Sequence, residues 1–167
     1  MTAAFVGVGS NLDGPEARIR RALDDLGRLP RTRLSGASGL YRNPPMGPAD
    51  QPDFVNAVAW LETDLVPLAL LDALQRLEAR QGRRRGRHWG PRTLDLDLLS
   101  MGESRIASER LDLPHPGVAE RAFVLVPWAE VAPDYLVPGL GRVADLASRC
   151  ACEWLSRIAG PTTPEMP

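Results

Sequence analysis

The alternation of apolar and polar residues changes its period along the first part of the chain, and each period predicts a different element. Residues 3–10 form a short apolar run with β-branched side chains, which is typical of a strand. After it, apolar residues recur at helical spacing, at Ile19, Ala22, Leu23 and Leu26. We expect this helix to have Asp13 as its N-cap, to carry Pro15 in its first turn and to end before Pro30.

The next segments alternate between extended and irregular structure. Residues 32–41 form a second extended run, and residues 43–52 contain four prolines and a glycine, which predicts an irregular loop. Residues 54–62 are apolar at odd and even positions alike, so we expect a strand that is buried on both faces. Asn56 lies in this strand, and its amide therefore needs a hydrogen-bond partner.

The second half of the chain is predicted to contain a further strand and three helices. The first of these helices spans residues 66–81 and stops at Gly82, because apolar residues recur at Leu70, Leu71, Leu74 and Leu77. The remaining elements are a strand around Asp95 and Asp97, a hairpin arm at 105–111, a loop at 113–117, helices near 123–131 and 143–158, and a loose tail at 160–167.

The order strand, helix, strand, strand, helix, strand is that of a ferredoxin-like α+β sandwich, with helices on one face of an antiparallel sheet. Extra helices follow at the C-terminus. No linker or internal repeat interrupts the pattern, so we expect a single domain over residues 1–159 and a disordered tail at 160–167. This order by itself names no function, since the fold hosts enzymes, RNA-binding modules and metal carriers.

Candidate chemistry gathers in one segment. Residues 80–92 contain six arginines, and the strand that follows places Asp95 and Asp97 between leucines. Because alternate residues of a strand share a face, the two carboxylates would point one way while the leucines point into the core. Mg²⁺ commonly binds one or two carboxylates together with substrate phosphates, to which arginine donates hydrogen bonds. The segment indicates polyphosphate and metal chemistry, although a solvated strand face beside a charged loop has the same pattern.

Composition narrows the class of function. The chain has 167 residues, a net charge of −1 and a pI near 6.1, so its basic segment is local and favours a small anionic ligand over a nucleic-acid surface. All 20 residues counted as lysine or arginine are arginines. This excludes a Walker A loop and a lysine-dependent protein-kinase site.

The two cysteines and the absence of long apolar segments bear on location. Cys150 and Cys152 would diverge on the helix expected at 143–158, which disfavours a disulfide or a metal site and favours two buried or half-buried thiols. We find no signal-peptide pattern and no apolar run that could span a membrane. The expectation is a cytoplasmic protein that binds neither membrane nor nucleic acid.

Several motifs stand in a characteristic order. They are GSNL at residues 9–12, PPMGP at 44–48, QPDFVN at 51–56, WGPRTLDLDLL at 89–99 and LPHP at 113–116. Together, over about residues 3–150, they closely resemble the 6-hydroxymethyl-7,8-dihydropterin pyrophosphokinase family. The resemblance implies transfer of pyrophosphate from ATP to the pterin hydroxymethyl group, with release of AMP, in folate biosynthesis. We expect a monomer whose partners are the small molecules ATP and hydroxymethyldihydropterin.

The resemblance further implies roles for individual residues. Asp95 and Asp97 match the ligands of two Mg²⁺ ions, and Asp97 is the candidate acceptor of the substrate proton. Arg83, Arg85 and Arg92 match arginines that neutralise the transferring group. The positions around ATP are matched by Gln75, Glu78, Leu98, Arg110, His115 and Arg121. The pterin pocket is matched by Gly9, Asn43, Pro44, Met46, Phe54, Asn56, Trp89 and Phe123, with the two phenylalanines on either side of the ring.

The chain departs from the family pattern at a few positions. Asn43 and Asp112 stand where threonine is usual, Phe54 and Pro116 stand where tyrosine is usual, and the arginine loop is one residue shorter. Two other functions also stay open. One is a different two-metal nucleotidyl or phosphoryl transferase, and the other is an RNA-binding module that grips RNA through the arginine loop. The missing RNP-like aromatic pattern counts against the RNA-binding module.

Overall fold

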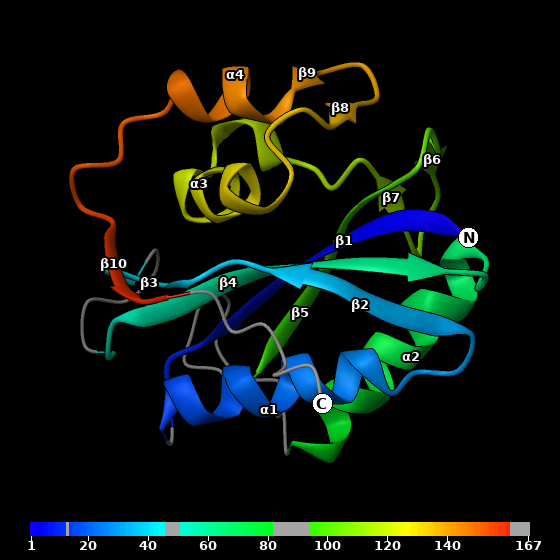
Figure 1. Ribbon diagram of the computed structural model, residues 1–167, viewed down its shortest axis with the longest axis horizontal. Coiled ribbons are helices and arrows are strands. Elements are labelled where there is room, and N and C mark those ends of the chain that lie inside the picture. The colour runs from blue at the N-terminus through cyan, green and yellow to red at the C-terminus, as the bar shows by residue number, and fades with distance from the viewer. Residues whose placement is uncertain (13, 46–50, 82–93, 161–167) are drawn as a thin grey trace.

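The computed structural model describes residues 1–12, 14–45, 51–81 and 94–160. Within these ranges the chain forms a six-stranded antiparallel sheet of order β10-β3-β4-β1-β5, with β2 also paired to β4 (Figure 1). The strands are β1 Thr2–Ser10, β2 Thr32–Ala37, β3 Leu40–Asn43, β4 Phe54–Thr63, β5 Asp95–Met101 and β10 Ser156–Ala159. Because β1 lies between β4 and β5, both of its edges are paired.

Helices cover both faces of this sheet (Figure 1). One face is covered by α1 Pro15–Gly27 and α2 Pro67–Arg80 and the other by α3 Ala122–Val131, while α4 Val143–Ser148 packs on the outer side of α3. The smaller elements are β6 Ile106–Ala107 paired with β7 Asp112–Leu113, η1 Val118–Glu120, and β8 Leu136–Val137 paired with β9 Gly141–Arg142. The predicted ferredoxin-like sandwich is confirmed, and its extra helices cover the face that α1 and α2 leave open.

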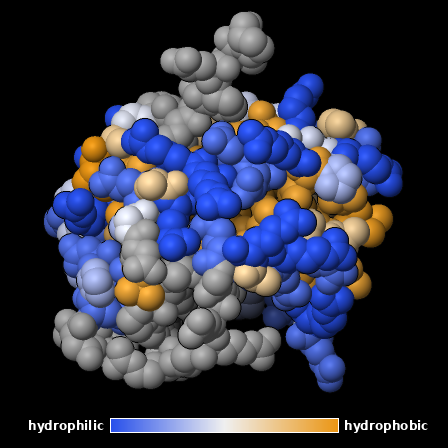
Figure 2. Space-filling model, turned by 90° about the horizontal axis from the view of Figure 1, so that it is seen from below, coloured by the Kyte–Doolittle hydropathy of each residue, from blue (hydrophilic) through white to orange (hydrophobic). Residues whose placement is uncertain are grey.

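The first core lies between the sheet and α1 and α2. The residues predicted from helical spacing are buried there, among them Ile19, Leu23, Leu70 and Leu74. The outward sides of the two helices are mainly hydrophilic, as the view from their side of the molecule shows (Figure 2). Burial of one leucine side chain stabilises the fold by about 1.5–3 kcal/mol, so this apolar stripe decides which way each helix faces.

The second core lies between the sheet and α3 and is aromatic. Phe5 of β1 meets Trp128 of α3 at a ring-centroid distance of 5.4 Å and Tyr135 at 4.6 Å. Trp128 and Phe5 are essentially inaccessible to solvent. Because both faces of the sheet are covered, β4 is buried on both faces, as its unbroken apolar run predicts.

Two consecutive leucines, Leu98 and Leu99, follow Asp97 in β5, and a bulge in this strand lets them point to opposite faces of the sheet. Its register with β1 shifts between Phe5 and Val6, so that Phe5 pairs with Ser100 and Val6 with Leu98. The intervening Leu99 is the extra residue of a bulge. Leu98 can therefore enter the first core while Leu99 enters the second.

The extended run at 32–41 is two strands rather than one. The chain leaves β2 at Ala37 and resumes as β3 at Leu40, and the side chain of Ser38 accepts a 2.9 Å hydrogen bond from the Val58 N–H at the break. Asn43 belongs to β3 and not to the irregular loop predicted at 43–52. A Cβ atom on Gly39 would collide with the Ala159 carbonyl oxygen, so glycine permits the C-terminal strand to approach here.

The prediction of one helix over 143–158 was wrong. Helix α4 ends at Ser148, and residues 156–159 form strand β10 on the edge of β3. Helical spacing could not anticipate this, because the partner of β10 lies more than a hundred residues earlier in the sequence. Both cysteines are free thiols; Cys150 is half-buried as predicted, whereas Cys152 is exposed and was wrongly expected to be at least half-buried.

The other boundaries differ little from expectation. Pro15 begins α1 as predicted, but the N-cap is Gly14, with φ of 69°, rather than Asp13. A hairpin arm is present as predicted, but its second strand, Asp112–Leu113, lies entirely beyond the predicted bounds of 105–111. Asp13, Gly82 and residues 161–167 lie outside the described residues. None of the described helices combines the length and apolar character that a membrane crossing requires.

A charged cluster joins α3, β3 and β10. The Glu130 carboxylate accepts hydrogen bonds from the Tyr41 hydroxyl at 2.6 Å, the Gly39 N–H at 2.7 Å and the Arg157 Nε at 3.1 Å. We call these four residues the Glu130 clamp. Burial and the hydrogen bond to Glu130 raise the pKa of Tyr41 to about 12. Burial alone would raise the pKa of Glu130, but the hydrogen bonds from Tyr41, Arg157 and Gly39 outweigh it and lower that pKa.

The clamp predicts a pH dependence of stability. Because the folded-state pKa of Glu130 lies below its ordinary value of 4.5, its charge stabilises the fold above that pH, and this contribution is lost as the pH falls through the folded-state pKa. We expect Glu130→Gln to lower the free energy of unfolding by about 1–2 kcal/mol at neutral pH. The difference should shrink in urea titrations at progressively lower pH. A difference that stays constant into the acid range would contradict the assignment.

Candidate functional site

The candidate site lies on the face of the sheet that carries α3, beyond the aromatic core. Strand β1 sets its layout, because Gly9 is directly opposite Asn56 of β4 on one side and Asp95 of β5 on the other. Gly7 is opposite Asp97. Alternate residues share a face, so the three strands present an amide, two glycines and two carboxylates together.

A first pocket, of about 90 Å³, opens at this position. Phe54 of β4 and Phe123 at the start of α3 both line it, so it lies between the sheet and the helix. Its lining residues are Gly7, Val8, Gly9, Asn43, Phe54, Asn56, Ala57, Asp95, Asp97, Arg121, Phe123 and Val124. Eight of the residues predicted as site residues thus meet in one pocket: Gly9, Asn43, Phe54, Asn56, Asp95, Asp97, Arg121 and Phe123.

A buried amide pair forms one wall of the first pocket. The Asn56 Nδ2 donates a hydrogen bond to the Asn43 Oδ1, and the Asn43 Nδ2 donates to the Pro44 carbonyl at 2.9 Å. The partner that Asn56 requires is therefore supplied by the residue that replaces the usual threonine. The Oδ1 of Asn56 faces Gly9, where an added Cβ atom would approach it to 2.8 Å.

A second pocket, of about 240 Å³, adjoins the first. It lies between β5, the β6-β7 arm and the loop that follows β7, and its residues include Asp97, Leu98, Arg110 and His115. Leu98 contributes from the floor, since it is 3% exposed. Asp97 lines both pockets, so a ligand in either one would reach the same carboxylate.

The carboxylates are partly open to solvent. The His115 Nε2 lies 3.9 Å from the Asp97 Oδ1, and the His115 Nδ1 is 2.8 Å from the Pro116 carbonyl oxygen. The backbone N–H of His115 also donates to the Leu99 carbonyl at 2.8 Å, which holds this loop against β5.

Arg110 forms an ion pair with Asp72 at 2.5 Å on the rim of the second pocket, and its hydrogen bond lowers the pKa of Asp72.

The donor set fits a hard divalent cation that shares its coordination with a ligand. In the described part of the chain, no cluster of three or more His, Cys, Asp or Glu side chains could hold a metal alone. Asp95 and Asp97 supply two carboxylates on one face, and Mg²⁺ usually completes its octahedron with phosphate oxygens and water. The arrangement suits an ion that arrives with a polyphosphate.

The remaining predicted residues fall into two groups. Gln75 is exposed on α2, and the buried Glu78 accepts a 2.9 Å hydrogen bond from the Leu96 N–H, which ties α2 to the aspartate-bearing strand. Pro44 lines neither pocket, but its carbonyl accepts the hydrogen bond from the Asn43 amide. Outside the described residues lie Met46, Arg83, Arg85, Trp89 and Arg92.

A buried contact of Asn11 supports the site from outside the pocket linings. Asn11 is 1% exposed, and its Nδ2 donates to the Gln51 Oε1 at 2.9 Å and to the Pro52 carbonyl at 3.1 Å. The contact joins the end of β1 to the segment that leads into Phe54. Asn11 belongs to the motif GSNL, and Gln51 and Pro52 belong to QPDFVN. The presence of both motifs in the family's order was the one sequence signal for this contact.

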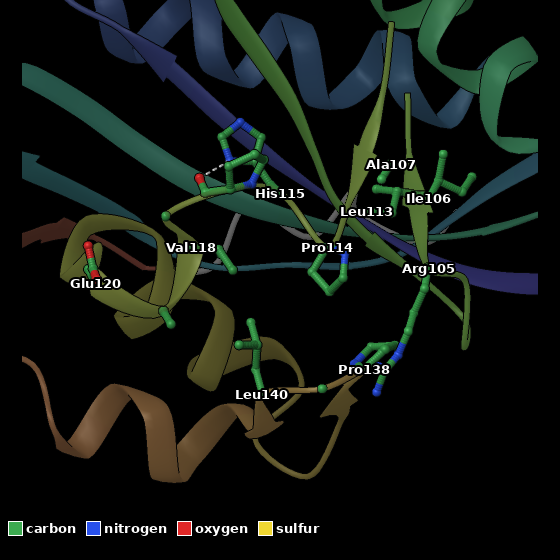
Figure 3. A pocket seen from close by; sticks show the side chains of 14 residues that line it. Arg105, Ile106, Ala107, Leu113, Pro114, His115, Val118, Glu120, Pro138 and Leu140 are labelled. Atoms are coloured by element: carbon green, nitrogen blue, oxygen red, sulfur yellow. Dashed lines mark hydrogen bonds between the residues drawn. The ribbon is translucent and has the colours of Figure 1, made fainter. Parts of the chain in front are cut away.

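A third cavity, of about 510 Å³, lies on the other side of the His115 loop. Arg105, Pro114, Val118 and Leu140 surround it, while the His115 ring lies at its edge, bonded to the Pro116 carbonyl (Figure 3). His115 and Pro116 also line the second pocket, so this loop is a wall common to the two cavities.

The sandwich and its two joined pockets define an α+β enzyme of the ferredoxin-like class. The family model for 7,8-dihydro-6-hydroxymethylpterin-pyrophosphokinase (HPPK) matches residues 5–133. The chain belongs to this family. A 2-amino-4-hydroxy-6-hydroxymethyldihydropteridine pyrophosphokinase of Pseudomonas aeruginosa is 51% identical over 156 residues, which cover 93% of this chain and 96% of the relative.

Two further comparisons agree with this assignment. The enzyme of the same name from Haemophilus influenzae is 46% identical over 151 residues, covering 90% of this chain and 94% of that one. The crystal structure of Plasmodium falciparum HPPK-DHPS with pteroate is similar with a TM-score of 0.69 at 13% identity. The similarity covers 89% of this chain and 42% of that longer chain, and it supports the fold alone.

The amide wall predicts unequal effects of two alanine substitutions on β1. In Gly9→Ala the new methyl group meets the held amide of Asn56, whereas in Gly7→Ala the nearest atom is the Leu99 Cδ2 at 3.4 Å. We expect Gly9→Ala to lower the free energy of unfolding by about 1–3 kcal/mol, the usual cost of overpacking, and Gly7→Ala by clearly less. Urea denaturation measures both, and equal losses would contradict the packing described.

Proposed function

We propose that this chain transfers the pyrophosphoryl group of ATP to the hydroxymethyl group of 6-hydroxymethyl-7,8-dihydropterin, giving the pterin diphosphate and AMP in folate biosynthesis. The single observation that carries this proposal is the position of Asp97 in the lining of both pockets. A bisubstrate transfer requires two ligands that meet at a charged centre, and the first pocket suits a flat ring while the second is open to a nucleotide.

The first pocket is the proposed pterin site. Phe54 and Phe123 would pack against the two faces of the ring, and Asn56 would pair with its polar edge. Asn43 holds the Asn56 amide in one orientation, so the Oδ1 is the atom left to accept from the ligand. Gly9, Pro44, Met46 and Trp89 are assigned to the same site.

The second pocket is the proposed ATP site. Leu98 and His115 line it, and Arg110 stands at its rim where a guanidinium can donate to an anionic ligand. Gln75, Glu78 and Arg121 complete the set proposed around ATP, although Arg121 lines the first pocket and neither Gln75 nor Glu78 lines the second. Glu78 would act through β5, since its carboxylate holds the Leu96 N–H directly between Asp95 and Asp97.

Asp95 and Asp97 are the proposed ligands of two Mg²⁺ ions. When bound, the ions would neutralise phosphate charge and align the polyphosphate for in-line displacement. Arg83, Arg85 and Arg92 are assigned to the charge that develops on the transferring group.

The proposed reaction is a displacement at the β-phosphorus of ATP. The pterin hydroxyl oxygen forms a bond to the β-phosphorus while the bond from that phosphorus to the α-β bridging oxygen breaks, and AMP leaves. The hydroxyl proton passes to the Asp97 carboxylate, which faces both pockets. Positioning and charge neutralisation supply most of the catalysis.

The decisive experiment combines the purified chain with ATP, Mg²⁺ and 6-hydroxymethyl-7,8-dihydropterin and measures the nucleotide product. We expect AMP, formed only when the pterin is present. Release of pyrophosphate would indicate a nucleotidyltransferase, and ADP a simple kinase. RNA binding that ignores ATP and Mg²⁺ would favour the RNA-binding alternative.

We also propose that the enzyme works as a cytoplasmic monomer, with residues 1–159 as a single domain. The monomer is supported by the burial of the apolar stripe of each described helix in one of two internal cores. Sedimentation velocity at assay concentration tests the oligomeric state, and a dimer would contradict the proposed monomer.

The shared carboxylate predicts the effect of one conservative substitution. Asp97→Asn removes the charge between the pockets, so we expect the rate of AMP formation to fall by about a hundredfold or more while the fold persists. The matched control is Asp24→Asn on the exposed side of α1, which should leave the rate unchanged. Near-normal turnover of Asp97→Asn, with circular dichroism equal to that of the native chain, would contradict the role of Asp97.

A further inference from the structure

The two walls of the proposed pterin pocket belong to different layers of the fold. Phe123 and Val124 stand at the start of α3, whereas Asn43, Phe54 and Asn56 stand on strands β3 and β4. The gap between the walls therefore depends on how firmly α3 is held on the sheet. For a pocket of about 90 Å³, a small displacement of the helix changes the space that a flat ring can occupy.

The Glu130 clamp provides directional bonds between these layers. Glu130 supplies all the side-chain hydrogen bonds from α3 to the sheet that the described residues make, through Tyr41 and Gly39. Arg157 adds bonds at 3.1 and 3.4 Å from β10. The rest of the contact is apolar: Trp128 is fully buried, yet its Nε1 has no hydrogen-bond partner among the described atoms. The hydrophobic effect is non-directional, so the hydrogen bonds of the clamp add a directional constraint to the packing of α3.

Each end of the clamp is joined to the pocket by one rigid element. Phe123 and Glu130 are separated by two helical turns, or about 10 Å, so they lie on the same side of α3. Tyr41 and Asn43 are alternate residues of β3 and share a face. Tyr41 is also the register partner of Asn56 in β4 and of Arg157 in β10.

We propose that the Glu130 clamp is a positioning device for the ring substrate: it holds α3 at a set height above β3 and so fixes the gap between Phe123 and the amide wall. None of its residues lines the pocket, so it acts on the substrate only through Phe123 and Asn43. The second pocket lies against β5 and the β6-β7 arm, which the clamp does not touch. The proposal rests on the pterin assignment of the first pocket.

The test compares steady-state constants for both substrates in clamp variants and a control. We expect Glu130→Ala to raise the KM for the pterin about tenfold, and Tyr41→Phe and Arg157→Ala to raise it by smaller factors, with the KM for ATP changed less than about twofold. Glu130→Gln keeps the shape and part of the hydrogen bonding, so it should fall between Glu130→Ala and the native chain.

The matched control is Asp134→Asn. Asp134 follows α3 closely and forms a comparable 2.6 Å ion pair, but its partner is Arg142 rather than a strand of the sheet. Its pterin KM should stay within about twofold of the native value. Equal changes in both KM values, or a similar rise in the control, would indicate general loosening of the fold and overturn the proposal.

A second measurement does not depend on turnover. The side-chain amide signals of Asn43 and Asn56 report the pocket wall in the substrate-free protein, and NMR should show them shifted in Glu130→Ala but not in Asp134→Asn. If the native chain made no AMP, the proposed function would fail while these shifts still tested the clamp. Unchanged amide signals, or an unchanged pterin KM in an active Glu130→Ala enzyme, would overturn the inference.

Discussion

The register of three strands is the constraint on which the rest of the structure depends. With β1 paired on both sides, Gly9 is held opposite Asn56 and Asp95, and Gly7 opposite Asp97. A shift of one residue in the β1-β5 pairing would send the carboxylates into the apolar core and the leucines toward the ligand, and a shift in the β1-β4 pairing would turn Asn56 away from the site. The cost of burying unpaired carboxylates makes this register strongly preferred. The register that buries the apolar side chains of the sheet therefore also places the residues of the site.

The two helical layers divide the work between stability and function. The face under α1 and α2 is a continuous apolar core. The opposite face is covered only in part, by the aromatic packing of Phe5 and Trp128 below α3, and the pockets form where this cover ends. Asp97 stands where the two pockets join. The hydrogen bonds of the Glu130 clamp add a directional constraint to the apolar packing of α3, and α3 carries Phe123, which lines the first pocket.

Much of the site could be predicted because strand periodicity is local. The alternation of Asp95 and Asp97 with leucines indicated one polar face and one buried face without knowledge of the partner strand. The burial of Leu94, Leu96 and Leu98 confirms the buried face. Asn56 in an apolar run signalled a buried amide that needs a partner. The identity of that partner, Asn43, depends on how β3 pairs with β4, and no local pattern contains this information.

The sequence by itself determined the order of the first six elements, the buried faces of their strands and helices, and the family to which the chain belongs. These features could be predicted because periodicity, turn residues and motifs are local properties of the sequence. Only the tertiary structure decided the bulge at Leu99, the end of α4 at Ser148 and the return of residues 156–159 as a strand on β3. It alone brought Glu130 to Tyr41 and Asp97 into two pockets. These features follow from pairings between distant segments, whose energies depend on burial and on partners that a local pattern does not specify.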